Sequence, residues 1–192
     1  MKGNQKTRVV NDITAAHIRI LYWFFAYPDK DFTFNGICEV TNTSKTTARA
    51  IIDDLCRNKW IRKTVLGRLW RLAANRETLE FRHAKIAHNL ENVYATGIDK
   101  TVLNLYPQAR AIILFGSFRK GDDASESDLD IAVEVPGTEE LQIKPIGEIA
   151  MLGYRKNVKV NLHVFSRKKV DLNVFSNIAN GIILHGFLEV RP

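Results

Sequence analysis

The sequence has few of the residues that define several large protein classes. Its 192 residues include only 2 Cys, 5 Pro and 11 Gly. Cys38 and Cys56 lie in helix-like stretches without a CxxC pair or a nearby histidine, so we expect neither a disulfide framework nor a zinc site, and we interpret both as small buried side chains. The low Pro and Gly content, with 45% hydrophobic and 26% charged residues, excludes collagen-like and low-complexity chains and indicates a globular protein.

Long hydrophobic runs are also missing. The longest uncharged apolar runs, residues 20–28 and 111–118, are much shorter than the roughly 20 residues of a membrane helix. The start MKGNQKTRVV lacks the apolar core of a signal peptide. We therefore expect a cytoplasmic protein with no membrane partner, and a length of 192 residues favours two small domains over one.

The positive charge is confined to one part of the chain. Residues 1–75 contain 13 Lys and Arg against 6 Asp and Glu, whereas residues 76–192 contain 15 of each kind. This asymmetry predicts a module that binds a polyanion, most commonly nucleic acid, joined to a neutral module. A surface kept soluble by lysines is the alternative explanation.

Residues 1–75 follow the pattern of helix, helix, turn, helix and hairpin. Apolar residues at helical spacing predict helices over 12–27, 33–41 and 45–59, with the turn TNTS before the third helix and Ser44 as its cap. The stretches IRKTV and RLWRLA alternate apolar and polar residues around Gly67, which predicts a two-stranded hairpin. This order resembles the winged helix-turn-helix family of DNA-binding proteins, although the glycine usual near Asn58 or Lys59 is missing.

The resemblance implies that the third helix enters the major groove of duplex DNA while the hairpin lies along the backbone. The residues that would contact DNA from the helix are Lys45, Thr46, Thr47 and Arg49. Those that would contact it from the hairpin are Arg62, Lys63, Arg68 and Arg71. Winged helices also serve as protein-binding or dimerisation modules, which leaves a homodimer as the alternative.

Residues 76–106 predict a helical linker. An amphipathic pattern runs from Glu77 to Tyr94 and ends at Gly97, and a second short helix is expected over 98–106. His83 and His88 lie five residues apart on the first helix, which is a poor spacing for metal binding, and we expect both at the surface. The linker would be a semi-rigid connection or a dimer interface.

Residues 107–192 contain two motifs that suit phosphate and metal chemistry. A short apolar strand ends in Gly116-Ser117, where glycine permits close backbone approach and the serine offers donors to phosphate oxygens. Asp128 and Asp130 begin the next apolar run, and strand alternation places them on one face about 7 Å apart. Two carboxylates so close repel unless a cation such as Mg²⁺ or Mn²⁺ neutralises them. An acidic surface loop is the alternative interpretation.

The stretch LFGSFRKGDDASESDLDIAV resembles the nucleotidyltransferase superfamily that includes DNA polymerase beta, and in particular its minimal branch. The resemblance implies that Gly116 and Ser117 bind the triphosphate of an NTP, and that Asp128 and Asp130 are catalytic residues that bind the metal ions. It also implies that helix, strand and helix follow the second aspartate, with IANGIILHG as the last helix.

The third carboxylate of that family falls on a strand expected over 158–165, at the triplet Val160-Asn161-Leu162. Asn161 is neutral, so it can offer a metal an amide oxygen but cannot accept the proton of an attacking hydroxyl. His163 lies two residues further along the same face, as a partly exposed structural histidine or as a base.

These patterns predict an α+β chain: a winged helix of three helices and a β-hairpin over 1–75, the linker, and a nucleotidyltransferase mixed sheet with flanking helices over 107–192. We expect a DNA-associated nucleotidyltransferase-like protein that binds an NTP such as ATP with Mg²⁺. It would transfer a nucleotide, for example AMP, to a small molecule or to a protein such as a partner toxin, which would make it antitoxin-like. The alternative, favoured by Asn161, is a transcriptional regulator whose impaired domain is a nucleotide sensor or dimer platform.

Overall fold

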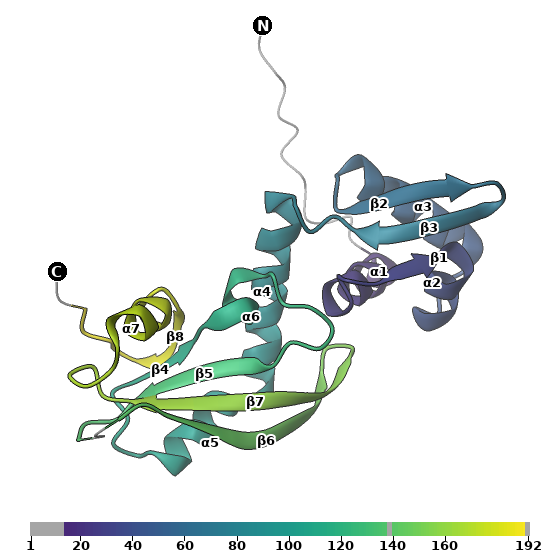
Figure 1. Cartoon of the computed structure of the whole chain (residues 1–192). Helices are drawn as coiled ribbons and strands as arrows, with labels where there is room; N and C mark the ends of the chain where they lie inside the picture. Colours follow the sequence, from purple (N-terminus) through teal and green to yellow (C-terminus); the bar gives the residue numbers. More distant parts are fainter. Residues whose placement is uncertain (1–13, 138–139, 191–192) are drawn as a thin grey trace, which may run out of the picture.

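The chain forms two sheets that lie in different halves of the sequence (Figure 1). The structure, a computed structural model, describes residues 14–137 and 140–190. The first sheet has the strand order β1-β3-β2, and the second has the order β6-β7-β5-β4-β8. Within the described ranges, no helix combines the length and the apolar character needed to cross a membrane.

The N-terminal domain packs three helices against the first sheet. Its elements are α1 (Ala15–Ala26), β1 (Asp31–Thr33), α2 (Phe34–Val40), α3 (Lys45–Arg57), β2 (Ile61–Leu66) and β3 (Leu69–Ala74). Hydroxyl side chains cap the helices: Thr14, Thr33 and Ser44 each accept a hydrogen bond from a backbone N–H of the first turn. The expected cap at Ser44 and the expected hairpin turn at Gly67, which has a φ of 61°, are both present.

Lys59, two residues after the end of α3, takes the place of the glycine usual for this topology. Lys59 adopts a φ of 59°, the left-handed conformation for which glycine is favoured. The core of the domain is aliphatic and aromatic, and its fully buried members include Ile20, Phe24, Ile37, Ile52, Leu55 and Leu72. Cys38 is buried as expected, but Cys56 is only partly buried, because it lies at the edge of the stripe that α3 turns inward.

The helix α4 (Leu79–Thr96) belongs to both halves of the molecule. Its Phe81 is part of the N-terminal core, and its Val93 is part of the core beneath the second sheet. The helix ends at Gly97 with a φ of 65°, as the sequence predicts, and α5 (Ile98–Leu105) follows at once. His88 is buried rather than exposed, because the helix turns it toward the rings of Tyr22 and Phe25.

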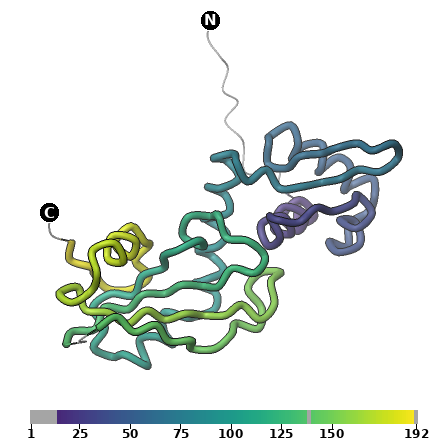
Figure 2. Tube along the Cα trace, viewed as in Figure 1, coloured from purple at the N-terminus to yellow at the C-terminus, as the bar shows by residue number. Residues whose placement is uncertain are grey.

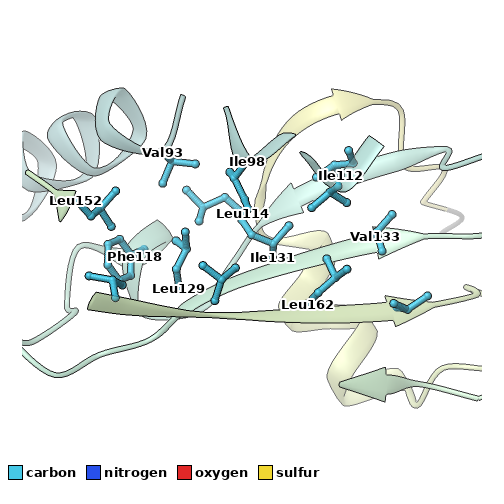
Figure 3. Close-up of a cluster of buried hydrophobic side chains, with 14 of the residues drawn as sticks. Val93, Ile98, Ile112, Leu114, Phe118, Leu129, Ile131, Val133, Leu152 and Leu162 are labelled. Atoms are coloured by element: carbon cyan, nitrogen blue, oxygen red, sulfur yellow. The ribbon is translucent and has the colours of Figure 1, made fainter. Parts of the chain in front are cut away.

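The C-terminal domain is a mixed sheet covered on both faces. Its remaining elements are β4 (Ala111–Leu114), α6 (Gly116–Lys120), β5 (Leu129–Glu134), β6 (Gln142–Leu152), β7 (Arg155–Phe165), α7 (Leu172–Ala179) and β8 (Ile182–Gly186). The strands β5 and β7 are parallel, and the other neighbouring pairs are antiparallel. Side chains from α4 and α5 pack on one face, as Figure 3 shows around Val93 and Ile98, and α7 packs on the other through Ile178.

Two elements of this domain differ from the sequence-based expectation. The segment expected to be a helix after the second aspartate is the strand β6, paired with β7. Apolar residues at positions 143, 146 and 149 have a helix-like spacing, but Pro145 lacks an N–H, which a helix interior needs and an edge strand does not. The ending IANGIILHG is not one helix: α7 ends at Ala179, and β8 pairs with β4, whose edge would otherwise be open.

Candidate functional site

The turn after β4 brings the backbone directly against an aspartate of β5. Gly116 has a φ of 70°, and a Cβ at that position would lie 2.7 Å from Oδ2 of Asp130. The backbone N–H of Phe115 donates to the carbonyl of Asp130 at 3.2 Å, which fixes the two chain segments side by side. Glycine is therefore required here by both backbone conformation and space. Ser117 follows in the first turn of α6 and is partly exposed.

The aspartates occupy the positions that strand alternation predicts. Leu129 is fully buried, whereas Asp128 and Asp130 on either side of it are partly exposed. The side-chain amide of Asn161 donates from Nδ2 to Oδ2 of Asp128 at 3.2 Å. Asn161 is also the register partner of Asp130 between the parallel strands β5 and β7. The structure thus brings both aspartates and the third position together on one face of the sheet.

His163 completes this group from the same strand as Asn161. Its Nε2 atom lies 3.3 Å from Oδ1 of Asp130, and its ring meets the ring of Phe115 edge-on at 4.8 Å between centroids. The side chain is 14% exposed, so His163 is partly exposed, as the sequence predicts. Each aspartate therefore has a polar partner on β7.

The donor set fits a hard divalent cation but carries less charge than three carboxylates would. Asp128, Asp130 and, after rotation of its amide, Asn161 offer only oxygen atoms, which are the ligands that Mg²⁺ prefers. Among the residues that the structure describes, there is no cluster of three or more His, Cys, Asp or Glu side chains suited to a metal ion. Two carboxylates and one amide are the donors available.

A cleft of about 350 Å³ opens beside this group. It shares Gly116 and His163 with the carboxylate site, and its far walls come from the start of β6 and from α7. Arg119 and Lys120, the last residues of α6, bring positive charge to its rim. The apolar part of the lining comes from Phe115, Leu141, Ile143 and Val174. A largely apolar cavity with a few polar groups at one end suits a small ligand with a charged tail.

Buried charged side chains, which the sequence did not predict, fix the loop that precedes Asp128. Asp123 is 2% exposed, and its carboxylate contacts Nζ of Lys85 at 2.5 Å and Nδ2 of Asn89 at 2.7 Å. The guanidinium of Arg155, on β7, lies 3.7 Å from the same carboxylate and donates to the carbonyl of Ser127. Burial lowers the pKa of Lys85, and the contact with Asp123 opposes that change. The acids of this loop are thus not one solvated surface patch.

The expected DNA-contacting residues of α3 lie at the surface. Lys45, Thr46, Thr47 and Arg49 are all exposed. The guanidinium of Arg49 lies over the ring of Trp70 at 4.7 Å from its centroid, so the hairpin supports the side chain.

The basic residues of the hairpin fall into two groups. Arg62 and Arg68 are exposed. Lys63 forms an ion pair with Asp53 at 2.6 Å, and Arg71 forms one with Asp31. Two of the four hairpin residues expected to contact DNA therefore form ion pairs within the domain.

Comparison with known proteins identifies the C-terminal part of the chain. Residues 97–184 match the family model for a nucleotidyltransferase domain, which includes α5 as well as the sheet. Comparison with curated proteins gives no match.

Two solved structures overlap with about half of the chain. One is MepR, a transcription regulator of the Staphylococcus aureus multidrug efflux pump MepA, with a TM-score of 0.36, 19% identity, and coverage of 49% of this chain and 76% of that chain. The other is the heme sensor protein PefR from Streptococcus agalactiae, with a TM-score of 0.34, 17% identity, and coverage of 48% of this chain and 61% of that chain. At these TM-scores the overlaps support no inference.

The family match concerns the C-terminal part of the chain, and the topology describes the N-terminal domain. The order α1, β1, α2, α3, β2 and β3, in which the hairpin follows the third helix and β1 pairs with β3, is that of a winged helix. Residues 97–184 match a nucleotidyltransferase domain, and the domain that precedes them in the same chain has the topology of a winged helix.

Proposed function

We propose that the chain is a DNA-associated nucleotidyltransferase-like protein that binds an NTP with Mg²⁺ or Mn²⁺. The observation that carries this proposal is that Asp128 and Asp130 lie with Asn161 beside the Gly116 turn, which also lines a cleft with a cationic rim. The transfer we propose is that of a nucleotide, for example AMP from ATP, to a protein or small-molecule hydroxyl. A partner toxin is one such protein acceptor.

Each group of the site has a role in this proposal. Asp128 and Asp130 would hold the cation, which when bound stabilises negative charge on the triphosphate and the attacking oxygen. The backbone N–H groups of Gly116 and Ser117 would donate to the phosphates, since the Gly116 turn lies directly against Asp130. Arg119 would neutralise phosphate charge from the rim of the cleft.

The proton of the acceptor needs a separate group. Asn161 cannot take it, because an amide has no basic site. The ring of neutral His163 can, and it lines the cleft while it contacts Asp130. In this proposal His163 is the base if the domain is an active enzyme.

A second candidate function is favoured by Asn161. In it, the chain is a transcriptional regulator whose nucleotidyltransferase domain binds a nucleotide without transferring it, as a sensor or dimer platform. The hydrogen bond from Asn161 to Asp128 stabilises that carboxylate without a cation, so the site is stable when empty of metal. Label transfer distinguishes the two: in incubations with ATP, CTP, GTP or UTP labelled at the α-phosphate and Mg²⁺, with and without cell lysate, the protein labels an acceptor beyond what lysate alone labels only if the domain is an enzyme.

Loss of both aspartates tests nucleotide binding. Asp128→Asn with Asp130→Asn should abolish the Mg²⁺ dependence of NTP binding in calorimetry, because too few hard oxygen ligands remain. Asp122→Asn is the matched control, since Asp122 is an exposed acid of the same loop. Unchanged Mg²⁺-dependent binding in the double variant would reduce the site to an acidic loop.

The N-terminal domain supplies the proposed DNA contacts. Replacing Arg62, Lys63, Arg68 and Arg71 by Ala should weaken binding to all duplex sequences, and each lost phosphate contact should lower the slope of log affinity against log salt by about 0.9. Because Lys63 and Arg71 are in internal ion pairs, we expect the pair Arg62 and Arg68 to account for most of the loss. Lys45→Ala or Arg49→Ala should instead change the sequence preference.

Lysines of the other domain provide the control for this experiment. Lys156→Ala with Lys159→Ala removes two exposed positive charges from β7 without touching the winged helix. An unchanged salt slope in the hairpin variants, or an equal loss in the β7 variants, would exclude the hairpin from the DNA interface.

A further inference from the structure

The loop over 121–128, which joins α6 to the first aspartate of the site, is also held from outside by the winged helix. Both oxygens of Asp29 take part: Oδ1 accepts from the backbone N–H of Ser125 at 2.8 Å, and Oδ2 accepts from the Ser125 hydroxyl at 2.9 Å. Burial alone would raise the pKa of Asp29, but the hydrogen bonds from Ser125 outweigh it and lower the pKa. Asp29 therefore stays ionised at neutral pH and keeps both acceptors.

Asp29 is the centre of a wider contact between the domains. The hydroxyl of Tyr27 donates to the carbonyl of Tyr154 at 2.8 Å, and Trp23 packs edge-on against the ring of Tyr154. Lys30 lies 3.9 Å from Glu126 in the same loop. In Figure 2, the chain after α1 runs beside both the loop over 121–128 and the turn between β6 and β7.

The path from Asp29 to the site is short. Ser125 is held by Asp29, and Ser127, two residues later, accepts a hydrogen bond from Arg155 at its carbonyl. The Ser127 hydroxyl accepts from the backbone N–H of Ala124 at 2.9 Å, which closes the loop on itself. The next residue is Asp128. Its backbone therefore follows directly from a segment that is fixed by Arg155 on one side and by Asp29 on the other.

We propose that Asp29, a residue of the winged-helix domain, is a positioning residue for the nucleotide site, because it fixes the loop that places Asp128. This inference rests on the proposed function, since it assigns a role in Mg²⁺-dependent NTP binding. The nucleotide site is then incomplete without the N-terminal domain, although none of the cleft-lining residues that the structure describes comes from that domain.

The test compares Asp29→Ala with Asp31→Ala in the full chain. Asp31 is a matched control: it is an aspartate two residues away, and its ion pair is with Arg71 inside the N-terminal sheet. Calorimetry with Mg²⁺ and ATP should show about tenfold weaker binding for Asp29→Ala, within the range of measured couplings between sites, and less than a twofold change for Asp31→Ala. Thermal unfolding confirms that each variant is folded.

A second readout follows the loop itself. Amide hydrogen exchange in residues 121–128 should accelerate in Asp29→Ala and not in Asp31→Ala, because only the former frees the Ser125 N–H. Ser125→Ala removes the hydroxyl hydrogen bond to Asp29 but keeps the one from the backbone N–H, so it should weaken ATP binding in the same direction and by less, and it decides the question if Asp29→Ala does not fold. The double variant should bind ATP no more weakly than Asp29→Ala, because Asp29→Ala already removes both hydrogen bonds with Ser125.

The outcomes separate this role from the proposed function. If the wild-type chain binds no NTP with Mg²⁺, the proposed function fails and this role fails with it. If the wild type binds ATP and Asp29→Ala and Ser125→Ala bind it equally well, the role of Asp29 alone is refuted. Additive effects in the double variant would also refute it, because they would show that Asp29 acts through something other than Ser125.

Discussion

Replacing Asn161 by Asp tests what stabilises the carboxylates of the site when no metal ion is bound. In the wild-type chain, Nδ2 of Asn161 donates to Oδ2 of Asp128 at 3.2 Å, and Asp130 lies opposite in the strand register. Asn161→Asp replaces this donor by a third carboxylate at nearly the same distance. The variant therefore exchanges a hydrogen bond for a like-charge repulsion, and only a cation can remove that repulsion.

The size of the effect follows from the geometry. Two unit charges about 4 Å apart repel by about 1 kcal/mol in water and about 4 kcal/mol at an effective dielectric constant of 20. The site is partly exposed, so we take about 2 kcal/mol as the combined cost of the repulsion and the lost hydrogen bond. For a chain of this size, that cost lowers the midpoint of thermal unfolding by about 4 to 8 °C.

Thermal unfolding with and without Mg²⁺ measures this balance. With EDTA, Asn161→Asp should unfold at a lower temperature than the wild type, and excess Mg²⁺ should reverse the loss, since a ligand that binds only the folded state stabilises it. Asn157→Asp, at an exposed position of β7, is the control and should respond to neither. An equal midpoint in EDTA for the variant and the wild type would refute the argument.

The same variant separates the enzyme from the sensor. The added carboxylate should raise nucleotide transfer by one to three factors of ten, each worth about 1.4 kcal/mol of transition-state stabilisation, while it changes NTP affinity little. Single-turnover label transfer measures the rate. Fast transfer by the wild type that Asn161→Asp leaves unaltered would show that the third position does not limit the reaction, and would favour His163 or a substrate group as the base.

Two further predictions concern single positions. Gly116→Ala should weaken Mg²⁺-dependent NTP binding at least tenfold, because the new Cβ displaces the Asp130 carboxylate. Gly67→Ala is the control and should not weaken binding, since Gly67 has a similar φ of 61° but a Cβ there would have no atom within 4 Å. Equal losses of NTP binding in the two variants, measured by calorimetry, would contradict this reasoning. Burial lowers the pKa of His88 to about 4, whereas the same side chain in the unfolded chain keeps its ordinary pKa of about 6.5. As the pH falls, His88 is therefore protonated first in the unfolded chain. The free energy of unfolding should decrease by about 3 kcal/mol between about pH 6.5 and 4. Denaturant unfolding of His88→Gln should show a smaller loss over that range than His83→Gln, an exposed control on the same helix, and equal slopes would contradict the assignment.

The parts of the fold that local patterns encode could be predicted from the sequence. Helix spacing, the Ser44 cap and the Gly67 turn were enough for the three helices and the hairpin of the N-terminal domain, because each depends on residues close in the chain, but they did not predict β1, which pairs with β3. The grouping of Asp128 and Asp130 followed from strand alternation, and the place of Asn161 beside them followed from the family resemblance.

The parts that depend on distant contacts could not be predicted. β6 has helix-like apolar spacing, and only its pairing with β7 makes it a strand. Nothing in the sequence around Asp123 marks it as buried, because its partners Lys85 and Arg155 lie far away in the chain. The burial of His88 likewise depends on how α1 packs on α4. In each case the deciding interaction is tertiary, so no local pattern carries it.

The partners of the two aspartates bear directly on which function the domain has. Asn161 donates to Asp128, and His163 contacts Asp130, so both carboxylates have a polar partner on β7 before any cation binds. A cation must therefore compete with at least the Asn161 hydrogen bond, and it gains two carboxylates rather than three. Weaker metal binding would make occupancy depend on the nucleotide that brings the cation, which suits a sensor of Mg²⁺-bound NTP. An enzyme of the same architecture would need its acceptor to supply the missing negative charge and His163 to take the proton, and label transfer by the wild type and Asn161→Asp distinguishes that enzyme from a sensor.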